Sequence, residues 1–593
     1  MAKRTASNRV MQAAAVLLAA LLVVGCATGR GAEGSLLKRP FGTVEMIERE
    51  FVSGDPGGSL VLGFEDEPTS FNPASLGIRP IDVALRNALF AAPIERDPIS
   101  GNWVGNLAEE WRVDEEGTGL EITLREGLRW SNGEELTVED VIYSVRHLYL
   151  GEDAGANGRG WPNLDAVTIE RSGERSYTLA ARNAHIDLFA LAAAPPLPAR
   201  ILEERIGEAD LVAAVDEWSL SGASNLVSSG PFVVSAYESG KEVRLERNPH
   251  YHRSDGAGRQ LPYLDELLFR QVPEANSIDA MVTGTVDVAL LPHREMGTLQ
   301  ERMESGYYIY GSEFQPDSLF LTFNQNPVEE RGDPGVFEPR LTWFSDIRFR
   351  TAMAHLVDQE RIVTETLDGD GERRQGIRPE ESPYYLAPTL VSQPDYDPGR
   401  AEELLAEMGF REKNEQGILI NQEGVPLNFT LLTNDSNSER VAMAAIFAEE
   451  AQAIGVDVAV RTVPFQDLAR RLMAGTGWDA AIMGFSGAID PWFPQHFLLS
   501  SGMLHMIEPG QEQPRREWEQ EIDRLWQVSR ETLDEKRQRE LQHEIEEIWA
   551  RELPFIYLPD IPHYIVSRVA LGNAIRKIYD PRILPLERLF LTR

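Results

Sequence analysis

Residues 101–148 of the chain, GNWVGNLAEEWRVDEEGTGLEITLREGLRWSNGEELTVEDVIYSVRHL, decide the fold prediction and are called the signature stretch below. Apolar and polar residues alternate over 120–124, which predicts a half-buried strand. Ser-Asn-Gly at 131–133 predicts a turn. Thr137 then stands where it can cap a helix, with acidic residues in the first turn. None of these residues is of a catalytic type, so the stretch predicts architecture and no chemistry.

The signature stretch resembles that of the extracellular solute-binding proteins of the peptide/nickel class, the receptors of peptide-importing ABC transporters. The family pattern is LA-x-x-W, then LR-x-G-x-x-W-x-x-G, then DV-x-x-S. The matching residues are Leu107, Ala108, Trp111, Leu124, Arg125, Gly127, Trp130, Gly133, Asp140, Val141 and Ser144. Further family-like strings follow in family order, among them SGPF at 229–232 and YDPGRAEELLAEMGF at 396–410. The resemblance extends from about residue 60 to the C-terminus.

The resemblance implies an α/β fold of two lobes, the type II periplasmic-binding-protein fold of the large peptide-binding class. A hinge between the lobes and an extra subdomain in the first lobe are part of that fold. The β-α-β rhythm of residues 427–460 predicts a doubly wound lobe on its own. The predicted division is the core of lobe I over 52–80, 221–312 and 556–593, the extra subdomain over 81–220, and lobe II over 313–555.

The N-terminus reads as an export signal. Basic residues precede a short apolar run at 13–24, so residues 1–25 are predicted to be a signal peptide. Cys26 is the only cysteine, which excludes a disulfide within the chain. Residues 23–26, Val-Val-Gly-Cys, resemble a bacterial lipobox, which implies lipidation of Cys26 and a membrane anchor. Residues 26–51 are rich in Gly and small residues and are expected to form a tether, so the protein is expected to be exported and lipid-anchored.

Length and charge narrow the class of protein. A chain of 593 residues is too long for one compact core, so at least two lobes are expected. The chain carries 94 acidic against 57 basic residues and a formal net charge of −37. A field of this sign repels nucleic acid, which is therefore not expected as a partner.

The motifs of common enzymes are missing from the sequence. His543-Glu544 lacks the second histidine of a zinc-protease helix, and residues 484–487 lack the spacing of a nucleophile elbow. Residues 368–372 begin like a calcium loop, but Arg373 stands where glycine is needed. We therefore expect no enzyme activity, no cofactor and no metal site, and an exported hydrolase is only a remote alternative.

Ligand contacts are expected in the loop after residues 480–483, which read as a buried strand. Ligands collect at the carboxyl ends of strands in open α/β sheets. In the family that the chain resembles, the first Asp of this loop binds a peptide's ammonium group through a charge-assisted hydrogen bond. Here Ala488 stands at that position, and Asp490 matches the second Asp of the family pattern. Asp490 is therefore either a relocated ammonium anchor or a helix-cap or turn residue.

Aromatic residues near this loop are candidates for the cleft wall, with the core as the alternative for each. The residues expected to contact ligand are Asp490, Trp492, Phe485, Ser486, Asn324, Ser229 and Trp161. No arginine stands just before the loop to hold a peptide carboxylate. An extended peptide held by backbone hydrogen bonds, or a different solute, is therefore an alternative to a short zwitterionic peptide.

These observations predict the substrate-binding component of an ABC importer. It would bind a peptide by hinge closure, as a monomer, and deliver it to the permease subunits in the membrane. An oligosaccharide or a metal chelate is the alternative ligand, because the family that the chain resembles includes such receptors.

Overall fold

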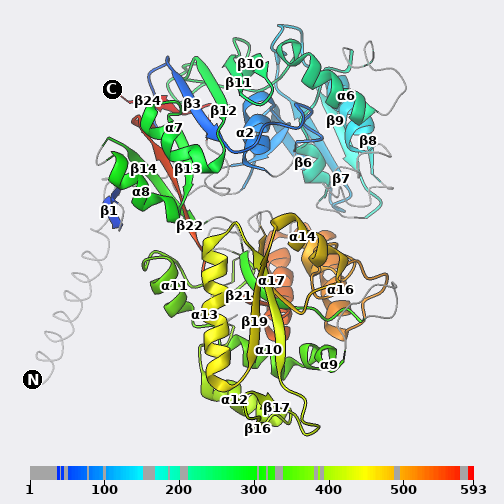
Figure 1. Cartoon of the computed structure of the whole chain (residues 1–593). Helices are drawn as coiled ribbons and strands as arrows, with labels where there is room; N and C mark the ends of the chain where they lie inside the picture. The colour runs from blue at the N-terminus through cyan, green and yellow to red at the C-terminus, as the bar shows by residue number, and fades with distance from the viewer. Residues whose placement is uncertain are drawn as a thin grey trace, which may run out of the picture.

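The computed structural model describes most of the chain and shows an α/β protein of two lobes joined along one side (Figure 1). The residues described are 36–39, 42–45, 51–76, 79–97, 102–150, 167–183, 187–200, 203, 211–303, 306–314, 318–327, 338–378, 385–386, 393–485, 494–574 and 585–592. The signal peptide and Cys26 lie outside these residues. Among the residues that the structure describes, no helix is both long and apolar enough to cross a membrane.

The first lobe is built on a nine-stranded mixed sheet. In spatial order its strands are β1 (Leu36–Arg39), β2 (Gly42–Glu45), β14 (Tyr308–Phe314), β22 (Pro562–Ser567), β13 (Val288–Pro292), β3 (Ser59–Phe64), β12 (Glu266–Gln271), β11 (Glu242–Arg247) and β10 (Phe232–Glu238). The central strand β3 pairs in parallel with both β12 and β13. Between those two strands the chain forms η3 (Glu274–Asn276) and α7 (Ser277–Thr283), and α8 (His293–Met303) follows β13. Helix α7 ends at Gly284, whose φ of 74° is left-handed, as expected for a glycine stop.

The signature stretch lies in a smaller unit attached to this sheet. Its four-stranded sheet has the order β6 (Ala108–Val113), β7 (Gly119–Leu124), β9 (Ser176–Ala180) and β8 (Thr168–Arg171). A hairpin and helices complete the unit: β4 (Ile94–Arg96), β5 (Trp103–Gly105), α2 (Pro80–Leu89), α3 (Val138–Ser144), η1 (Val145–Tyr149), α4 (Asp187–Ala192), α6 (Leu211–Ser221) and η2 (Ala223–Asn225).

The predicted strand and helix start of the signature stretch are confirmed. Thr137 caps α3, and the Asp140 carboxylate accepts a hydrogen bond from the Thr137 amide at 2.8 Å and one from the Trp130 indole at 3.4 Å. Burial raises the pKa of Asp140, although these hydrogen bonds oppose the shift. The signature residues of this unit therefore hold its core together.

The second lobe has a five-stranded sheet in the order β19 (Asp457–Val463), β18 (Asn428–Asn434), β20 (Ala480–Phe485), β15 (Ser318–Phe323) and β21 (Phe555–Tyr557). Strands β18, β19 and β20 run parallel, as the doubly wound prediction requires. Around the sheet lie α9 (Arg340–Ser345), α10 (Ile347–Ala354), α11 (Gln359–Thr366), α12 (Pro398–Glu407), α13 (Ser438–Ile454), α14 (Phe465–Ala474), α15 (Gln495–Leu498), α16 (Glu517–Arg530) and α17 (Glu535–Glu552). Two short antiparallel pairs are formed by β16 (Glu412–Lys413) with β17 (Leu419–Ile420) and by β23 (Leu571–Gly572) with β24 (Phe590–Leu591). Apolar cores cover both faces of the lobe II sheet.

The chain passes between the lobes after β14 and after β21. The first crossing lies between Phe314 and Ser318, and the second lies between Tyr557 and Pro562. The predicted boundaries at 312/313 and 555/556 fall inside β14 and β21, so both are too early. Each strand continues past its predicted boundary because its backbone groups still pair with a neighbouring strand. The partner of β14 is β22 in lobe I, and the partner of β21 is β15 in lobe II.

The tether predicted over 26–51 also needs correction. Within it, β1 and β2 form an antiparallel hairpin, and Val44 of β2 pairs with Ile309 of β14. An edge strand such as β14 has unpaired backbone groups along one side, and an added strand satisfies them. Part of the predicted tether is therefore an extension of the lobe I sheet.

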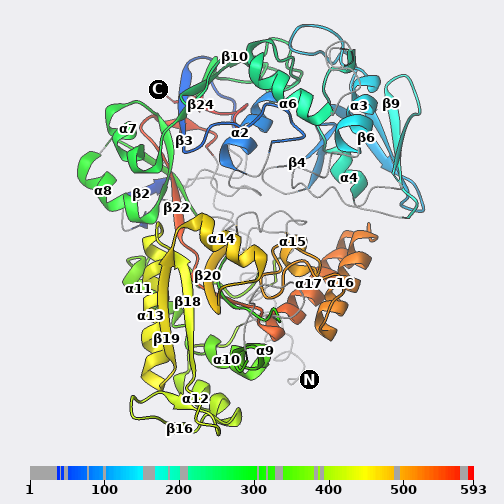
Figure 2. The same cartoon turned by 45° about the vertical axis from the view of Figure 1, so that its right-hand side comes forward.

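The sheets of the two lobes face each other with the carboxyl ends of their parallel strands. In lobe I the carboxyl ends of β3 and β13 point toward lobe II, because Pro292 at the end of β13 pairs with His563 just after the crossing. In lobe II, β21 ends at that crossing and runs parallel to β20, since both pair antiparallel with β15. Figure 2 shows α14, which follows β19, on the side of lobe II that faces lobe I.

Candidate ligand-binding cleft between the lobes

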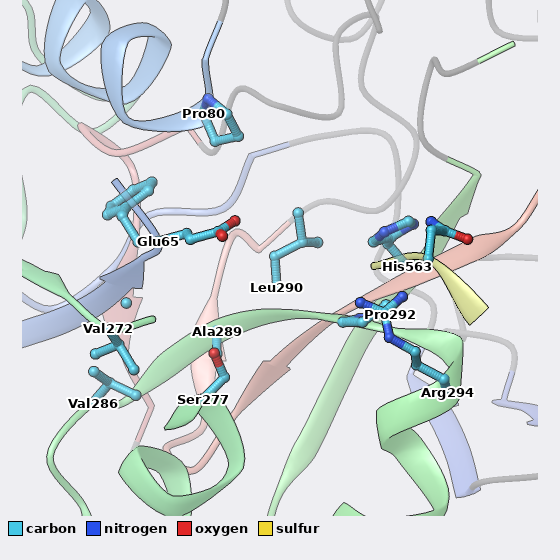
Figure 3. A pocket seen from close by; sticks show the side chains of 13 residues that line it. Glu65, Pro80, Val272, Ser277, Val286, Ala289, Leu290, Pro292, Arg294 and His563 are labelled. Carbon is cyan, nitrogen blue, oxygen red and sulfur yellow. The ribbon is translucent and has the colours of Figure 1, made fainter. Parts of the chain in front are cut away.

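A cavity of about 340 Å³ lies where the two lobes meet. Its volume falls in the range of small-molecule sites, about 300–1,000 Å³. Figure 3 shows side chains from both ends of the cavity, with Glu65 and Pro80 at one end and His563, Pro292 and Arg294 at the other. The lining residues are Gly63, Phe64, Glu65, Pro80, Val272, Ser277, Val286, Ala289, Leu290, Pro292, Arg294, Asn437 and His563.

The cavity lies where sheet topology places a binding site. Glu65 follows the carboxyl end of β3, Leu290 and Pro292 belong to the end of β13, and Asn437 is the N-cap of α13 in lobe II. The side chain of Asn437 accepts a hydrogen bond from the Arg440 amide at 2.8 Å, which starts the helix. Residues far apart in sequence thus meet at the carboxyl ends of strands, where open α/β sheets bind ligands.

Two contacts join the lobes beside the cavity. Arg294 of α8 donates from Nη1 to both carboxylate oxygens of Glu439 in α13, each at 3.3 Å. The Glu439 side chain is 3% exposed. His293 lies 3.4 Å from Asp368 and 3.7 Å from Asp370 of the segment after α11. These contacts set how the lobes sit against each other at the hinge side of the cavity.

Replacing Arg294 by glutamine is expected to lower the free energy of unfolding by about 1.5–3 kcal/mol, because the buried Glu439 loses its cation. The midpoint of thermal unfolding measures the change. Arg302→Gln is the matched control, since Arg302 lies on the same helix and pairs with Asp279 inside lobe I. Equal shifts for the two variants would contradict a special role of the contact between the lobes.

Arg440 belongs to the first turn of α13, three residues after the cavity-lining Asn437, and is not itself a lining residue. Its Nη1 donates to Oδ1 of Asn434, the last residue of β18, at 3.1 Å. A Cβ placed on Gly484 of β20 would come within 3.0 Å of Arg440 Nη2. The guanidinium therefore lies between the carboxyl ends of two neighbouring parallel strands, where it can bind an anionic group.

Sequence reasoning looked for an arginine only before the loop after β20 and missed Arg440. The signal that could have found it is its place in the first turn of a helix. The helix dipole disfavours a cation there, so an arginine in a first turn at the end of a strand merits attention.

Three predicted ligand residues are described, and each is buried inside the protein. The ring of Phe485 packs against Phe320 and stacks on Phe497, with centroids 5.0 and 5.4 Å apart. Asn324 is 0% exposed and donates to the carbonyls of Gly475 and Trp478. The Ser229 hydroxyl accepts from the Ala91 amide at 3.0 Å.

The structure thus gives Phe485, Asn324 and Ser229 packing and hydrogen-bonding roles in the interior. Of the two interpretations weighed for Phe485, this placement favours the core. The remaining predicted residues, Asp490, Trp492, Ser486 and Trp161, lie outside the described residues, and their ligand contacts stay predictions. Among the described residues, no group of three or more His, Cys, Asp or Glu side chains is placed to hold a metal ion.

The fold and cleft define a two-lobed binding protein, and comparison with known proteins gives its family. The sequence pattern described as "Bacterial extracellular solute-binding proteins, family 5 Middle" matches residues 102–503. The chain therefore belongs to the family 5 bacterial extracellular solute-binding proteins, as the signature stretch predicted. The family and fold are those of substrate-binding proteins.

Curated relatives carry names that agree with this family. A "Probable ABC transporter-binding protein" of Deinococcus radiodurans is 27% identical over 410 residues, covering 66% of this chain and 67% of the relative. The oligopeptide-binding protein AppA of Bacillus subtilis is 27% identical over 435 residues, covering 72% of this chain and 74% of the relative.

Solved structures share the fold. The structure of Bacillus subtilis AppA in complex with a nonapeptide matches with a TM-score of 0.66 and 22% identity over 91% of this chain and 100% of AppA. NikA from Brucella suis in complex with Fe(III)-EDTA matches with a TM-score of 0.70 and 18% identity over 90% and 100% of the two chains. The predicted two-lobed α/β fold is confirmed.

Proposed function

We propose that this protein captures peptides between its lobes and delivers them to the permease of an ABC importer. The observation that carries the proposal is the cavity beside the carboxyl ends of β3 and β13, where Asn437 of lobe II joins a lining that otherwise comes from the first lobe. The oligopeptide-binding name of a relative that shares 27% identity over 72% of the chain supports a peptide as ligand.

Hinge closure is the proposed mechanism. Two crossings connect the lobes, so one lobe can rotate against the other about a short axis. A ligand that contacts both lobes only in the closed state shifts the population toward that state. The closed receptor is the form that the permease would recognise, and neither covalent chemistry nor ATP is needed in the receptor.

Opposite charges on the ligand would have separate anchors in the cleft. The Arg440 guanidinium, between the ends of β18 and β20, is the proposed partner of a peptide carboxylate. The loop after β20, with Ser486, Asp490 and Trp492, is the proposed second contact region, because it continues from the carboxyl end of that strand. The division into a lobe I core, an extra subdomain and lobe II belongs to this proposal, with the boundaries moved to the two crossings.

Export and anchoring complete the proposal. The apolar run before Cys26 supports a cleaved signal peptide, and Cys26 in its lipobox-like context supports a lipid anchor on the outer side of a membrane. A single receptor chain beside the permease subunits is the proposed assembly. Mass spectrometry of the purified full-length protein would test the anchor, since lipidation adds the mass of acyl chains to a peptide that begins at Cys26.

The ligand class is tested by mass spectrometry of what copurifies with the protein and is released by mild denaturation. We expect a ladder of mixed peptides. A single sugar or a metal chelate would overturn peptide capture and leave the receptor role standing. Cleavage of added peptides or sugars by the protein would contradict the receptor role itself.

A further inference from the structure

One end of the cavity carries a negative charge without a partner in the described protein. Glu65 is exposed and is the only acidic residue among the described residues that line the cavity. Within the described part of the chain, its carboxylate makes no hydrogen bond or ion pair. Figure 3 shows the carboxylate of Glu65 extending toward Leu290, on the same side of the cavity as Pro80.

Several apolar side chains line the cavity together with this carboxylate. Phe64, Pro80, Val272 and Val286 line the cavity, and Leu290 presents a side chain that is 39% exposed. Apolar side chains beside an exposed carboxylate lower the local dielectric constant, so the carboxylate attracts a cation more strongly than one in bulk water. An exposed leucine beside it offers burial to an aliphatic chain.

The positive features of the cavity lie at the other end. Arg294 is close to His563 and Pro292 in Figure 3, and its charge is matched by the two oxygens of Glu439 at 3.3 Å. Arg294 therefore does not neutralise Glu65. The formal net charge of −37 adds a long-range attraction for cations.

We infer that the Glu65 end of the cavity binds an aliphatic ammonium group of the ligand, with Glu65 as its counter-ion and the apolar wall around the carbon stem. The inference rests on the proposed function and names the ligand chemistry that this end of the site selects. A lysine side chain and a peptide N-terminus both supply this group. Lysine matches most fully, because its four-carbon stem packs on apolar surface while its ammonium reaches a polar partner.

The test compares synthetic peptides of graded length that contain either lysine or norleucine, an uncharged residue with a similar stem. Each peptide is offered with a free and with an acetylated N-terminus, and the retained fraction is measured by mass spectrometry. Glu65→Gln is the test variant. Asp66→Asn is the matched control, because the neighbouring Asp66 lies outside this cavity, 3.7 Å from Arg79. Both side chains are exposed, and unchanged melting temperatures will show that both variants fold.

We expect the wild-type protein and the Asp66→Asn control to prefer the cationic peptide by about tenfold or more. A preference for lysine identifies the side chain as the source of the ammonium, and a loss of binding on acetylation identifies the N-terminus. The Glu65→Gln variant should lose whichever discrimination the wild type shows. Unchanged discrimination in that variant would overturn the inference while peptide binding stands. Retention of no peptide by the wild type would overturn the proposed function and the inference with it.

Discussion

Replacing Glu519 by glutamine is expected to lower the free energy of unfolding by about 3–5 kcal/mol, the largest stability effect that we predict for one substitution. Glu519 is 0% exposed in α16, and its carboxylate accepts hydrogen bonds from the backbone amides of Arg515 and Arg516 at 3.0 and 2.9 Å. It also accepts from Gln511 Nε2 and His505 Nε2, each at 3.0 Å. A glutamine cannot accept at both ends of its side chain, so part of this set is left unpaired.

His505 is a buried neighbour of Glu519. Its ring is fully buried, with Nδ1 at 2.7 Å from the carbonyl oxygen of Phe497 and Nε2 facing Glu519. Both ring nitrogens therefore lie within hydrogen-bond distance of an oxygen atom of another residue. The variant would remove the carboxylate that Arg516 contacts in the interior and leave Arg516 with Glu508, at 3.3 Å, as its acidic neighbour.

The same carboxylate predicts acid sensitivity. Burial alone would raise the pKa of Glu519, but hydrogen bonding from His505 and the charge of Arg516 lower it to about 2. This value lies below the unfolded value of about 4.3. The stabilisation is therefore present above about pH 4.3 and is lost as the pH falls through the folded value.

Thermal unfolding at neutral and acidic pH measures both effects. The wild type should lose more stability than the Glu519→Gln variant between pH values above and below the unfolded pKa, since the variant has no carboxylate to protonate. Glu517→Gln, at an exposed position in the first turn of the same helix, is the control. Parallel pH profiles for the wild type and Glu519→Gln would contradict the proposed charge state.

Replacing Arg440 by glutamine is expected to weaken the binding of peptides with a free carboxylate by about 10- to 150-fold. This range corresponds to the roughly 1.5–3 kcal/mol of hydrogen bonds to charged groups. Arg440 is half-buried between the ends of β18 and β20, so solvent screens it less than a surface arginine.

Calorimetric titration with a peptide that copurifies with the protein provides the measurement, repeated with the C-terminally amidated form. Amidation should weaken binding to the wild type and leave binding to the Arg440→Gln variant nearly unchanged. Arg470→Gln, on an exposed part of α14, is the control and should behave as the wild type. An equal effect of amidation on wild type and Arg440→Gln would show that the carboxylate binds elsewhere.

The local elements were predictable because short-range rules govern them. Gly284 ends α7 with a left-handed φ of 74°, and Asp397 caps α12 by accepting a hydrogen bond from the Arg400 amide at 2.9 Å, as the residue types at these two helix ends favour. The residue spacing of the signature stretch predicted the family. In the structure, two of these residues, Trp130 and Asp140, form a buried hydrogen bond.

The site was less accessible to sequence reasoning. The cavity brings together the ends of β3 and β13 with the start of α13, and no local pattern reports contacts between such distant segments. The role of Phe485 could not be decided from sequence, since an aromatic residue at a strand end is compatible with both a cleft wall and a core. Here the rings of Phe320 and Phe497 surround it. Glu65 directly follows β3, and only the folded cavity shows that it is the acidic residue among the described lining residues.

A distance between the lobes tests the central claim of closure around a peptide most directly. Cys26 is the only cysteine, so a chain that starts after it can carry two introduced cysteines for spin labels. Exposed Glu121 in β7 and exposed Gln520 in α16 place one label on each lobe. We expect pulsed electron spin resonance to show a shorter label distance when a copurifying peptide is added back at saturation. An unchanged distance, with binding established by calorimetry, would contradict hinge closure.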